Sequence, residues 1–310
     1  MNLIRSNLMR LSHKINFFLR KHPFKGAYRL TRFISGVLVP SPHKLKKPVI
    51  VKTPFGFDFW VENIEKPGVE NYVYQYGIYE VGTISVIRAC LREGDCFLDI
   101  GSNVGLMTVV AASQTGPSGK VVAFEPEPRV RGIIQKNVEL NQFKNVTIND
   151  FAIGSESGAL KLHLQDEISL GSATLSRQEN GNDGIEVKVK KLDDYLQETQ
   201  IPNIRMMKVD VEGWEHEVLS GAQQLLSSPD APIICVEYSQ LSHEEDEIKD
   251  VYKFITSVND YHIYKLKKTK DWFSNLIKIN SDADLPDHDN LFCFLPGHLE
   301  TLPNDLLSKE

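Results

Sequence analysis

Two patterns of apolar and polar residues alternate along most of the chain. Short apolar runs bounded by glycine or polar residues predict strands, whereas segments whose apolar residues recur at spacings of three and four predict helices. From residue 93 onward we expect strands at 95–100, 121–125, 145–153, 206–210, 232–238, 262–266 and 291–295, and helices at 104–115, 129–140, 214–226 and 244–258. This alternation predicts a doubly wound α/β fold, with a mainly parallel sheet covered by helices on both faces.

Shorter elements precede and interrupt this series. Residues 49–61 predict two strands around a turn, and residues 83–92 predict a helix with Thr83 as its N-cap. Between residues 158 and 191 both ends alternate apolar and polar positions, which predicts an inserted β-hairpin. We therefore expect a leader, a set of N-terminal strands and a helix that pack on the core, and an α/β domain. Their bounds are 1–47, 48–92 and 93–310.

The leader combines an apolar stripe with basic residues. Over residues 1–22 the spacing predicts an amphipathic helix in which the two kinds of side chain lie on different sides. The stripe consists of Ile4, Leu8, Leu11, Ile15 and Phe18, and the basic residues are Arg5, Arg10, Lys14, Arg20 and Lys21. Pro23 ends the pattern, and a second basic stretch, interrupted by prolines, runs to Lys47.

Charge is distributed unevenly between the leader and the rest of the chain. Residues 1–57 contain twelve Lys and Arg and no acid, whereas residues 58–310 contain 23 basic and 41 acidic residues. The acidic body argues against broad binding to nucleic acid. The basic leader predicts peripheral contact of residues 1–47 with an anionic membrane surface; alternatively, its stripe packs on the domain or on a dimer partner. No apolar run is long enough for a membrane span, and the leader lacks a signal peptide's apolar core.

The composition of the chain limits the class of protein and the cellular compartment that we expect. With 41% hydrophobic and 25% charged residues the chain is an ordinary globular protein. The cysteines show no paired spacing, and Cys96, Cys235 and Cys293 lie in apolar runs, so we expect small buried hydrophobes in a reducing compartment and a cytoplasmic location. No HxxxH or HExxH spacing occurs, and no metal site is predicted.

The strongest chemical signal is the string DIGSNVG at 99–105, where an apolar strand ends in an acid and a glycine turn leads into a helix. Glycines let the backbone approach a ligand, and ligands of open α/β sheets bind outside the carboxyl ends of the strands. The spacing is neither the GxGxxG of dinucleotide sites nor a P-loop, and neither occurs in the chain. An acid beside the first glycine suits the ammonium group of a methionine moiety better than a phosphate.

Two further strands end in acids at the same edge of the predicted sheet. Glu125 ends the second strand, where a carboxylate can accept hydrogen bonds from both ribose hydroxyls; a solvated strand end is the structural alternative. Asp210 ends a later strand, and Glu212 and Glu215 follow it. In a cluster of carboxylates, the pKa of one member can be raised, one member can act as a base, or the cluster can hold a cation. For Glu215, charge compensation at a helix N-terminus is an alternative explanation.

Taken together, these strings resemble the FkbM-type methyltransferases, a branch of the class I fold that uses S-adenosylmethionine. The resemblance runs from about residue 53 to 237. The matching strings are TPFG (53–56), YE (79–80), GDCFLDIGSNVGL (94–106), GKVVAFEPEP (119–128), AIG (152–154), KKLDDYL (190–196) and KVDVEGWEHEVLSGA (208–222). The resemblance implies a methyltransferase whose acceptor is an oxygen atom, often on a sugar or a secondary metabolite. It also implies that residues 93–310 form the catalytic domain.

The resemblance also implies roles for individual residues. The implied cofactor-binding residues are Asp99, Gly101, Asn103, Gly105, Glu125, Asp150 and Ala152. The glycine turn with Asp99 would hold the methionine end, Glu125 the ribose, and Asp150 and Ala152 the adenine. Asp210 would face the centre of methyl transfer, and Glu212 is the second catalytic candidate, as a base or as partner to a cation. Ser102 stands where the family usually has Ala.

Other functions remain open at this point. A nucleotide-dependent oxidoreductase would need the missing GxGxxG, and the intact acids argue against a non-catalytic membrane-associated module on a methyltransferase-like fold. Enzymes that methylate the amino groups of nucleic acid bases carry Asn/Asp-Pro-Pro-Tyr where this chain has DVEG at 210–213. Trp214 suits either stacking on an acceptor or packing at a helix start. The tyrosines at 72, 74, 76 and 79 fit either a sugar-binding surface or a strand face.

Overall fold

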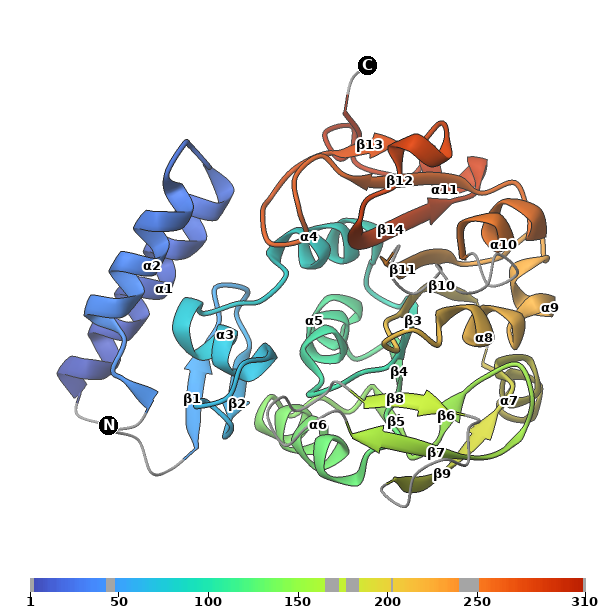
Figure 1. Ribbon diagram of the computed structural model, residues 1–310, viewed down its shortest axis with the longest axis horizontal. Helices are drawn as coiled ribbons and strands as arrows, with labels where there is room; N and C mark the ends of the chain where they lie inside the picture. The colour runs from blue at the N-terminus through green and yellow to red at the C-terminus, as the bar shows by residue number, and fades with distance from the viewer. Residues whose placement is uncertain are drawn as a thin grey trace.

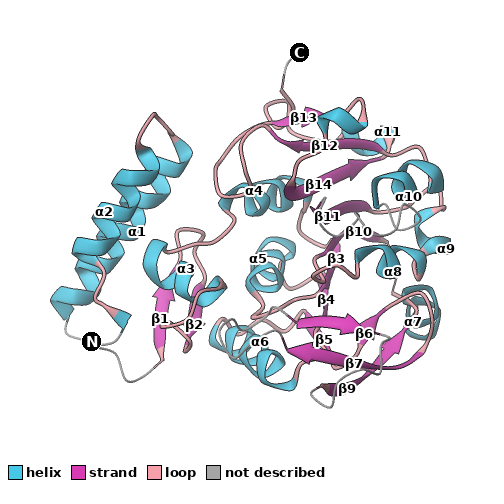
Figure 2. Ribbon diagram, viewed as in Figure 1, coloured by secondary structure: helices cyan, strands magenta, loops and turns pink. Residues whose placement is uncertain are grey.

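The computed structural model describes residues 3–42, 48–164, 173–176, 184–201, 203–239 and 251–308. A twisted central sheet carries helices on both faces, a smaller sheet lies beside it, and a pair of helices stands at the opposite side of the molecule (Figure 1). Figure 2 shows that this N-terminal pair contains no strand, whereas the rest of the chain mixes both kinds of element.

The described strands of the central sheet follow the order β13-β12-β14-β11-β10-β3-β4-β5. Their bounds are β3 Cys96–Ile100, β4 Lys120–Phe124, β5 Val146–Asn149, β10 Ile204–Val209, β11 Ile233–Ser239, β12 His262–Leu266, β13 Leu276–Lys278 and β14 His288–Phe294. Because β3 pairs in parallel with both β4 and β10, the chain proceeds outward from the middle in two directions. β14 runs antiparallel to its neighbours β11 and β12. The predicted doubly wound, mainly parallel sheet is confirmed.

Side chains of each central strand alternate between two cores. In β3, Phe97 packs into one core, while Leu98 and Ile100 pack into the other. The first core is covered by α4 (Val81–Cys90), α5 (Leu106–Thr115) and α6 (Pro128–Leu140), and the second by α7 (Leu192–Thr199), α8 (Glu215–Ser220), α9 (Gln223–Leu226) and α10 (Val251–Val258). With both faces shielded, the strands read as continuous apolar runs. A short 3-10 helix at Asp282–Asp284 and α11 (Pro296–Leu299) flank β14.

The expected strand at 145–153 is divided. β5 stays in the central sheet, but β6 (Ala152–Ile153) pairs in parallel with β9 (Ile185–Lys190) in a second sheet. That sheet has the order β6-β9-β7-β8, with β7 at Gly158–Leu164 and β8 at Ala173–Ser176. The antiparallel pairing of β7 with β9 confirms the predicted inserted hairpin, whose tip lies partly outside the described residues.

Two expected helices also differ from the structure. Residues 214–226 form α8 and α9 as separate short helices, and a Cβ on Gly221 between them would lie 2.0 Å from the carbonyl oxygen of Gly154. This close approach to a neighbouring backbone accompanies the break in the helix. Of the helix expected at 244–258, α10 begins at Val251, and residues 240–250 lie outside the description.

Residues 48–92 form two strands and two helices against the first core. β1 (Val49–Lys52) and β2 (Asp58–Val61) pair antiparallel as predicted. The tyrosines at 72, 74 and 76 lie in a helix, α3 (Val69–Tyr76), so the expectation of a strand face there is wrong. The expectation that Thr83 caps the helix is wrong: Thr83 lies inside α4, and Glu80 occupies the N-cap position. The hydroxyl of Thr83 instead accepts a hydrogen bond from the side chain of Asn290.

The N-terminal pair is a hairpin of α1 (Leu3–Lys21) and α2 (Ala27–Leu38). The first helix was expected, but the second was not, since residues 27–38 were interpreted only as part of a basic stretch. α1 contacts the rest of the molecule through the side of the helix opposite its apolar stripe: Nε2 of His13 lies 2.9 Å from the carbonyl oxygen of Tyr74, and Arg20 donates to the carbonyl of Asp271 at 2.8 Å. The expectation that the stripe packs on the domain is therefore wrong.

Two further expectations concern the whole chain. The four cysteines are buried and free, as predicted for small hydrophobes. None of the described helices has the length and apolarity needed to span a bilayer. The proposed division at residues 47 and 92 stays a prediction.

Candidate active site

A pocket lies at the carboxyl ends of β3, β4 and β10, at the point where the chain direction through the sheet reverses. The glycine turn after β3, Glu125 after β4 and the acidic loop after β10 all line it, as the sequence predicted. Its described lining contains seven acidic side chains, Glu80, Asp99, Glu125, Glu127, Asp210, Glu212 and Glu237, and two basic ones, Lys208 and Lys270. Such a pocket favours cationic ligands.

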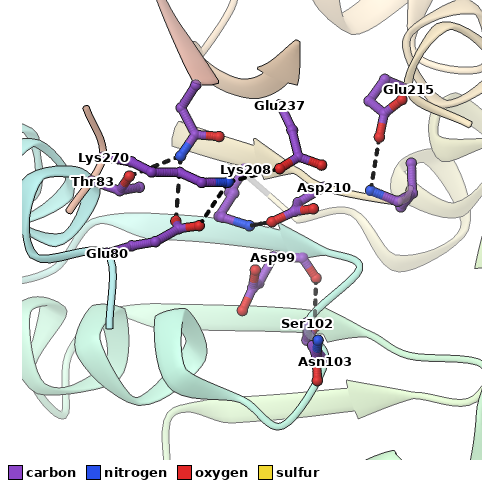
Figure 3. Close-up of polar contacts among 12 residues, drawn as sticks. Glu80, Thr83, Asp99, Ser102, Asn103, Lys208, Asp210, Glu215, Glu237 and Lys270 are labelled. Carbon is purple, nitrogen blue, oxygen red and sulfur yellow. Dashed lines mark hydrogen bonds and ion pairs between the residues drawn. The ribbon is translucent and has the colours of Figure 1, made fainter. Parts of the chain in front are cut away.

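Asp99 is buried at the base of this pocket, with one carboxylate oxygen satisfied and the other not. Thr108 of α5 donates to Oδ2 at 2.5 Å, while Oδ1 is buried without a hydrogen-bond partner in the structure. Burial raises the pKa of Asp99, although nearby Lys208 opposes the shift. Ser102 donates to the main-chain carbonyl of Asp99 at 2.7 Å and thereby fixes the turn (Figure 3). A buried carboxylate oxygen that has no hydrogen-bond donor in the protein is available to a donor on a ligand.

Gly101 allows the turn after β3 to lie directly against the end of β10. Its φ is +78°, and a Cβ there would stand 1.9 Å from the carbonyl oxygen of Asp210. Gly105 likewise has a φ of +84° and packs against Ile134 of α6. Asn103 adopts a φ of +48° between them, a conformation rare for residues with a side chain and frequent at functional sites. The spacing of the two glycines is thus a backbone requirement.

Glu125 organises the other side of the turn. Its Oε2 accepts the main-chain N–H of Asn103 at 3.0 Å, and its Oε1 accepts that of Glu127 at 3.0 Å. Burial raises the pKa of Glu125 to about 7, even though both N–H groups favour the charged form. Each oxygen retains a second lone pair on the pocket side. The arrangement is suited to two neighbouring hydroxyl donors, as on a ribose.

The two residues expected at the adenine lie apart. Ala152, the first residue of β6, is part of the pocket lining together with Ile153. Asp150 is exposed immediately after β5 and is not among the lining residues of the described pocket. The adenine role of both residues stays a prediction.

Asp210 is held by a buried cation. Nζ of Lys208 lies 2.6 Å from Oδ2 of Asp210 (Figure 3), and the Lys208 side chain is only 4% exposed. Burial by itself would raise the pKa of Asp210, but Lys208 and Lys270 outweigh it and hold the pKa at about 2. Asp210 is therefore ionised at all physiological pH values, and its proton affinity is low.

A second buried cation, which the sequence did not reveal, links three segments of the chain. Nζ of Lys270 lies 3.0 Å from Oε1 of Glu80 and 2.8 Å from Oε1 of Glu237 (Figure 3). Glu80 also lies within 3.4 Å of the Asn290 side-chain amide. Only the YE string of the family resemblance included Glu80. Glu237 ends the apolar run of β11, which was a usable signal, but nothing local marked Lys270.

The loop after β10 presents Glu212 to the pocket and uses Glu215 to hold its own backbone. Oε1 of Glu215 accepts the N–H groups of Val211 at 3.0 Å and Gly213 at 3.2 Å, which confirms a structural role for that acid. Glu212 has a φ of +53° and is the most exposed acid of the loop. Desolvation in the pocket and the charges of Asp210, Glu237 and Glu215 raise the pKa of its carboxyl to about 7.

Trp214 belongs to the packing rather than to the pocket lining. Its ring packs against the second core and the small sheet. The expectation of a packed aromatic at a helix start is confirmed.

Comparison with known proteins decides the family. The sequence profile described as "Methyltransferase FkbM domain" matches residues 99–263, more than half of the chain. The chain belongs to the FkbM methyltransferase family. It therefore carries a methyltransferase domain of class I, whose methyl donor is S-adenosylmethionine. Family membership also sets the oxidoreductase hypothesis aside.

Relatives with curated names show the range of the family. Hexuronic acid methyltransferase AglP of Haloferax volcanii is 26% identical over 62% of this chain and 75% of its own length. 2-O-methyltransferase NoeI of Sinorhizobium fredii is 25% identical over 66% and 84%. "Methyltransferase 1" of Beauveria bassiana is 30% identical over 41% of this chain, and the match spans only 58% of that relative.

Solved structures of other methyltransferases resemble this chain with lower sequence identity. Precorrin-6y C5,15-methyltransferase from Geobacter metallireducens aligns with a TM-score of 0.42 at 14% identity, over 78% of this chain and 97% of that one. A likeness of this size has no bearing on the substrate.

The pocket of this FkbM-family chain fits S-adenosylmethionine. The unmatched Oδ1 of Asp99 and the surplus of carboxylates suit the ammonium group and the sulfonium charge. The free lone pairs of Glu125 suit the ribose hydroxyls, and the small side chain of Ala152 leaves room beside β6. Of the residues assigned to the cofactor from the sequence, Asp99, Gly101, Asn103, Glu125 and Ala152 line this pocket, whereas Gly105 and Asp150 do not. Their roles in binding the cofactor stay predictions.

We expect Gly101→Ala to damage both stability and cofactor binding. Its Cβ would collide with the backbone of Asp210, and the residue would have to hold a left-handed conformation, so unfolding should become easier by about 2–4 kcal/mol. Gly132→Ala in α6 is the matched control, since a Cβ there meets nothing within 4 Å and should leave stability unchanged or raise it by up to about 1 kcal/mol. Urea unfolding measures both; equal stability of the two variants would contradict the close approach.

We expect Glu125→Ala to weaken binding of S-adenosylhomocysteine by about 1–3 kcal/mol, because hydrogen bonds to a carboxylate are lost. Calorimetry at pH 8, where Glu125 is ionised, measures the change. Glu139→Ala, at an exposed position of α6, is the control and should bind as the native chain does. Unchanged affinity of Glu125→Ala would remove the ribose assignment.

Proposed function

We propose that this protein methylates a hydroxyl group of a sugar or glycan, and that Glu212 removes the hydroxyl proton. The observation that carries the proposal is the pair of carboxylates after β10. Asp210 is ion-paired with Lys208, whereas Glu212 lies at the pocket with a raised pKa. AglP and NoeI, which act on a hexuronic acid and as a 2-O-methyltransferase, support an oxygen acceptor. A reducing compartment such as the cytoplasm suits the free buried cysteines.

The cofactor, when bound, supplies an electrophilic methyl carbon on a sulfonium. The chain's own contribution is then to align an acceptor and to take its proton. Asp99, the glycine turn and Glu125 would bind the donor at one side of the pocket. The acids of the loop after β10 would face the acceptor at the other side.

Glu212 suits the role of base better than Asp210. A base with a pKa near 7 is ionised at working pH and still holds a proton firmly enough to accept it from a hydroxyl, whereas the low pKa of Asp210 makes it a poor proton acceptor. Asp210 would instead accept a hydrogen bond from the acceptor and orient it. When the acceptor oxygen takes the methyl group, the bond from that methyl group to the sulfonium would break and leave the demethylated cofactor as a neutral thioether. Glu212 would take the O–H proton of the acceptor and later release it to solvent.

The charge of the pocket indicates the charge that the acceptor carries near its reacting hydroxyl. Seven acids face two lysines, and both lysines are already paired with carboxylates. A carboxylate on the sugar ring beside the reacting hydroxyl would be repelled. Tyr79 lines the same pocket with a pKa raised by burial, so its phenol stays protonated and can donate to a neutral sugar. We therefore infer a preference for a neutral hexose.

A paired substrate panel tests this function. The full chain is incubated with labelled S-adenosylmethionine and matched glucosides and glucuronides, and the products are analysed for an added methyl group. We expect methylation of a ring hydroxyl, with the neutral sugar favoured by at least about tenfold in kcat/KM, equal to about 1.4 kcal/mol. Preference for the glucuronide would overturn the charge argument, and methylation only at nitrogen or carbon in host extracts would overturn the proposed function.

The base assignment predicts a particular pH dependence. Glu212 must be ionised to accept a proton, so kcat should fall about tenfold per pH unit below its pKa of about 7 and level off above it. Glu212→Gln should lower kcat by about 10²–10⁴ and remove this dependence. Asp210→Asn should also lower kcat but keep a pH dependence, with its midpoint moved to lower pH, because the charge of Asp210 helps to raise the pKa of Glu212.

Two controls accompany this measurement. Cofactor affinity is followed over the same pH range, because Glu125 also has a pKa of about 7. Glu139→Gln should retain the native profile. If the midpoint disappears in Asp210→Asn and persists in Glu212→Gln, the two roles are exchanged.

A further inference from the structure

The N-terminal hairpin is built with its large apolar side chains outside. Of the eleven large apolar side chains exposed in the described part of the chain, nine lie between residues 4 and 37. We define the outer apolar surface as six of them from α1 and α2. These are Leu8, Leu11, Phe18, Leu30, Phe33 and Val37. Three are more than half exposed, with Phe33 at 69%, Val37 at 64% and Phe18 at 61%.

Most of the buried side chains of the hairpin are small or polar, although Met9 and Leu19 of α1 are buried as well. Asn16 of α1 donates to Ser35 of α2 at 2.8 Å, and Ser12, Thr31 and Ser35 are buried. A hairpin that folds against water does the reverse, because burial of leucine and phenylalanine is what stabilises it. Small and polar residues between helices, with large apolar residues outside, are typical of helices whose surroundings are lipid. The arrangement therefore indicates an apolar environment for the outer surface.

The charges of the hairpin specify the kind of apolar environment. Arg10, Lys14 and Lys21 lie exposed along one side of α1, and Arg29 and Arg32 lie exposed on α2. No acid occurs before Asp58. An apolar stripe flanked by basic residues is the pattern of helices that lie in the headgroup region of anionic bilayers. The rest of the chain is strongly acidic, so the basic hairpin is also the part of the molecule that such a surface attracts.

The hairpin is fixed to the catalytic domain next to the active site. Arg20 stacks over Tyr76 and Trp272 and donates to Asp271, which directly follows the pocket residue Lys270. Phe17 packs edge-on against Phe273 at 5.3 Å between ring centroids. A surface bound by the hairpin is therefore held in a defined place relative to the pocket.

We propose that the outer apolar surface docks the enzyme onto an anionic lipid bilayer, with α1 and α2 lying in the plane of the headgroups and the catalytic domain outside. The apolar side chains enter the boundary of the acyl chains, and the basic side chains contact lipid phosphates. The proposal does not depend on the identity of the methyl acceptor.

Vesicle flotation with the full chain tests this docking. The probes are vesicles of phosphatidylcholine alone and of phosphatidylcholine mixed with phosphatidylglycerol. We expect flotation with the anionic vesicles at 0.1 M salt, where charges act over about 10 Å, and release at 1 M, where they act over about 3 Å. Absence of flotation with anionic vesicles at low salt would overturn the proposal.

Variants assign the binding to the hairpin. The triple variant Leu11→Ser, Phe18→Ser, Phe33→Ser should lose flotation with the anionic vesicles at 0.1 M salt, where the native chain floats. The matched control replaces two exposed isoleucines elsewhere, Ile50→Ser and Ile185→Ser, and should float as the native chain does. Equal flotation of the triple variant and the native chain would overturn the assignment.

A charge variant and two further readouts complete the test. Arg10→Gln, Lys14→Gln and Arg29→Gln together should weaken binding to anionic vesicles by about fivefold per residue. Binding of S-adenosylhomocysteine should stay native in all variants, which shows that they fold. Light scattering without lipid reports on the other possible occupant: a dimer that the triple variant converts to monomer, together with no flotation, would show that a second copy covers the surface.

Discussion

The contact between Gly101 and the carbonyl of Asp210 sets the distance between the two halves of the active site. The turn after β3 carries the groups that fit the cofactor, and the loop after β10 carries the acids that we propose face the acceptor. Because β3 and β10 are adjacent parallel strands, their carboxyl ends emerge at the same edge, and a residue without a Cβ lets the two backbones touch. Any side chain at this position would push the donor away from the acceptor, and methyl transfer requires the two to be aligned.

Around this contact, buried charge is balanced by partners from distant parts of the chain. Lys208 pairs with Asp210, and Lys270 pairs with Glu80 and Glu237. Ion pairs of this kind contribute little net stability, since desolvation offsets their attraction, but they separate the properties of neighbouring acids. Asp210 and Glu212 are two residues apart, yet the pKa is lowered in one and raised in the other. That separation fits the proposed roles, in which Asp210 orients the acceptor hydroxyl and Glu212 takes its proton.

The same ionic cluster connects the catalytic pocket to the N-terminal hairpin. Lys270 and Asp271 are adjacent in sequence, and one pairs with the pocket acids while the other holds Arg20 of α1. In the hairpin, many large apolar side chains are exposed, whereas serine, threonine and asparagine side chains are buried. Under the proposed docking, the hairpin would place the pocket beside acceptors that are presented at a membrane surface.

Local patterns in the sequence determined the order of strands and helices from residue 93 onward, the glycine turn with Asp99, and the acids Glu125, Asp210 and Glu212. Strand and helix periods are short, and glycines and acids at strand ends act on their immediate neighbours, so a single sequence displays them. Tertiary structure alone decided that Lys270, Glu80 and Glu237 join the site, because they come from segments that no local spacing relates. It also decided which acid has a raised pKa and which side of α1 is buried, since both depend on what the fold packs against each residue.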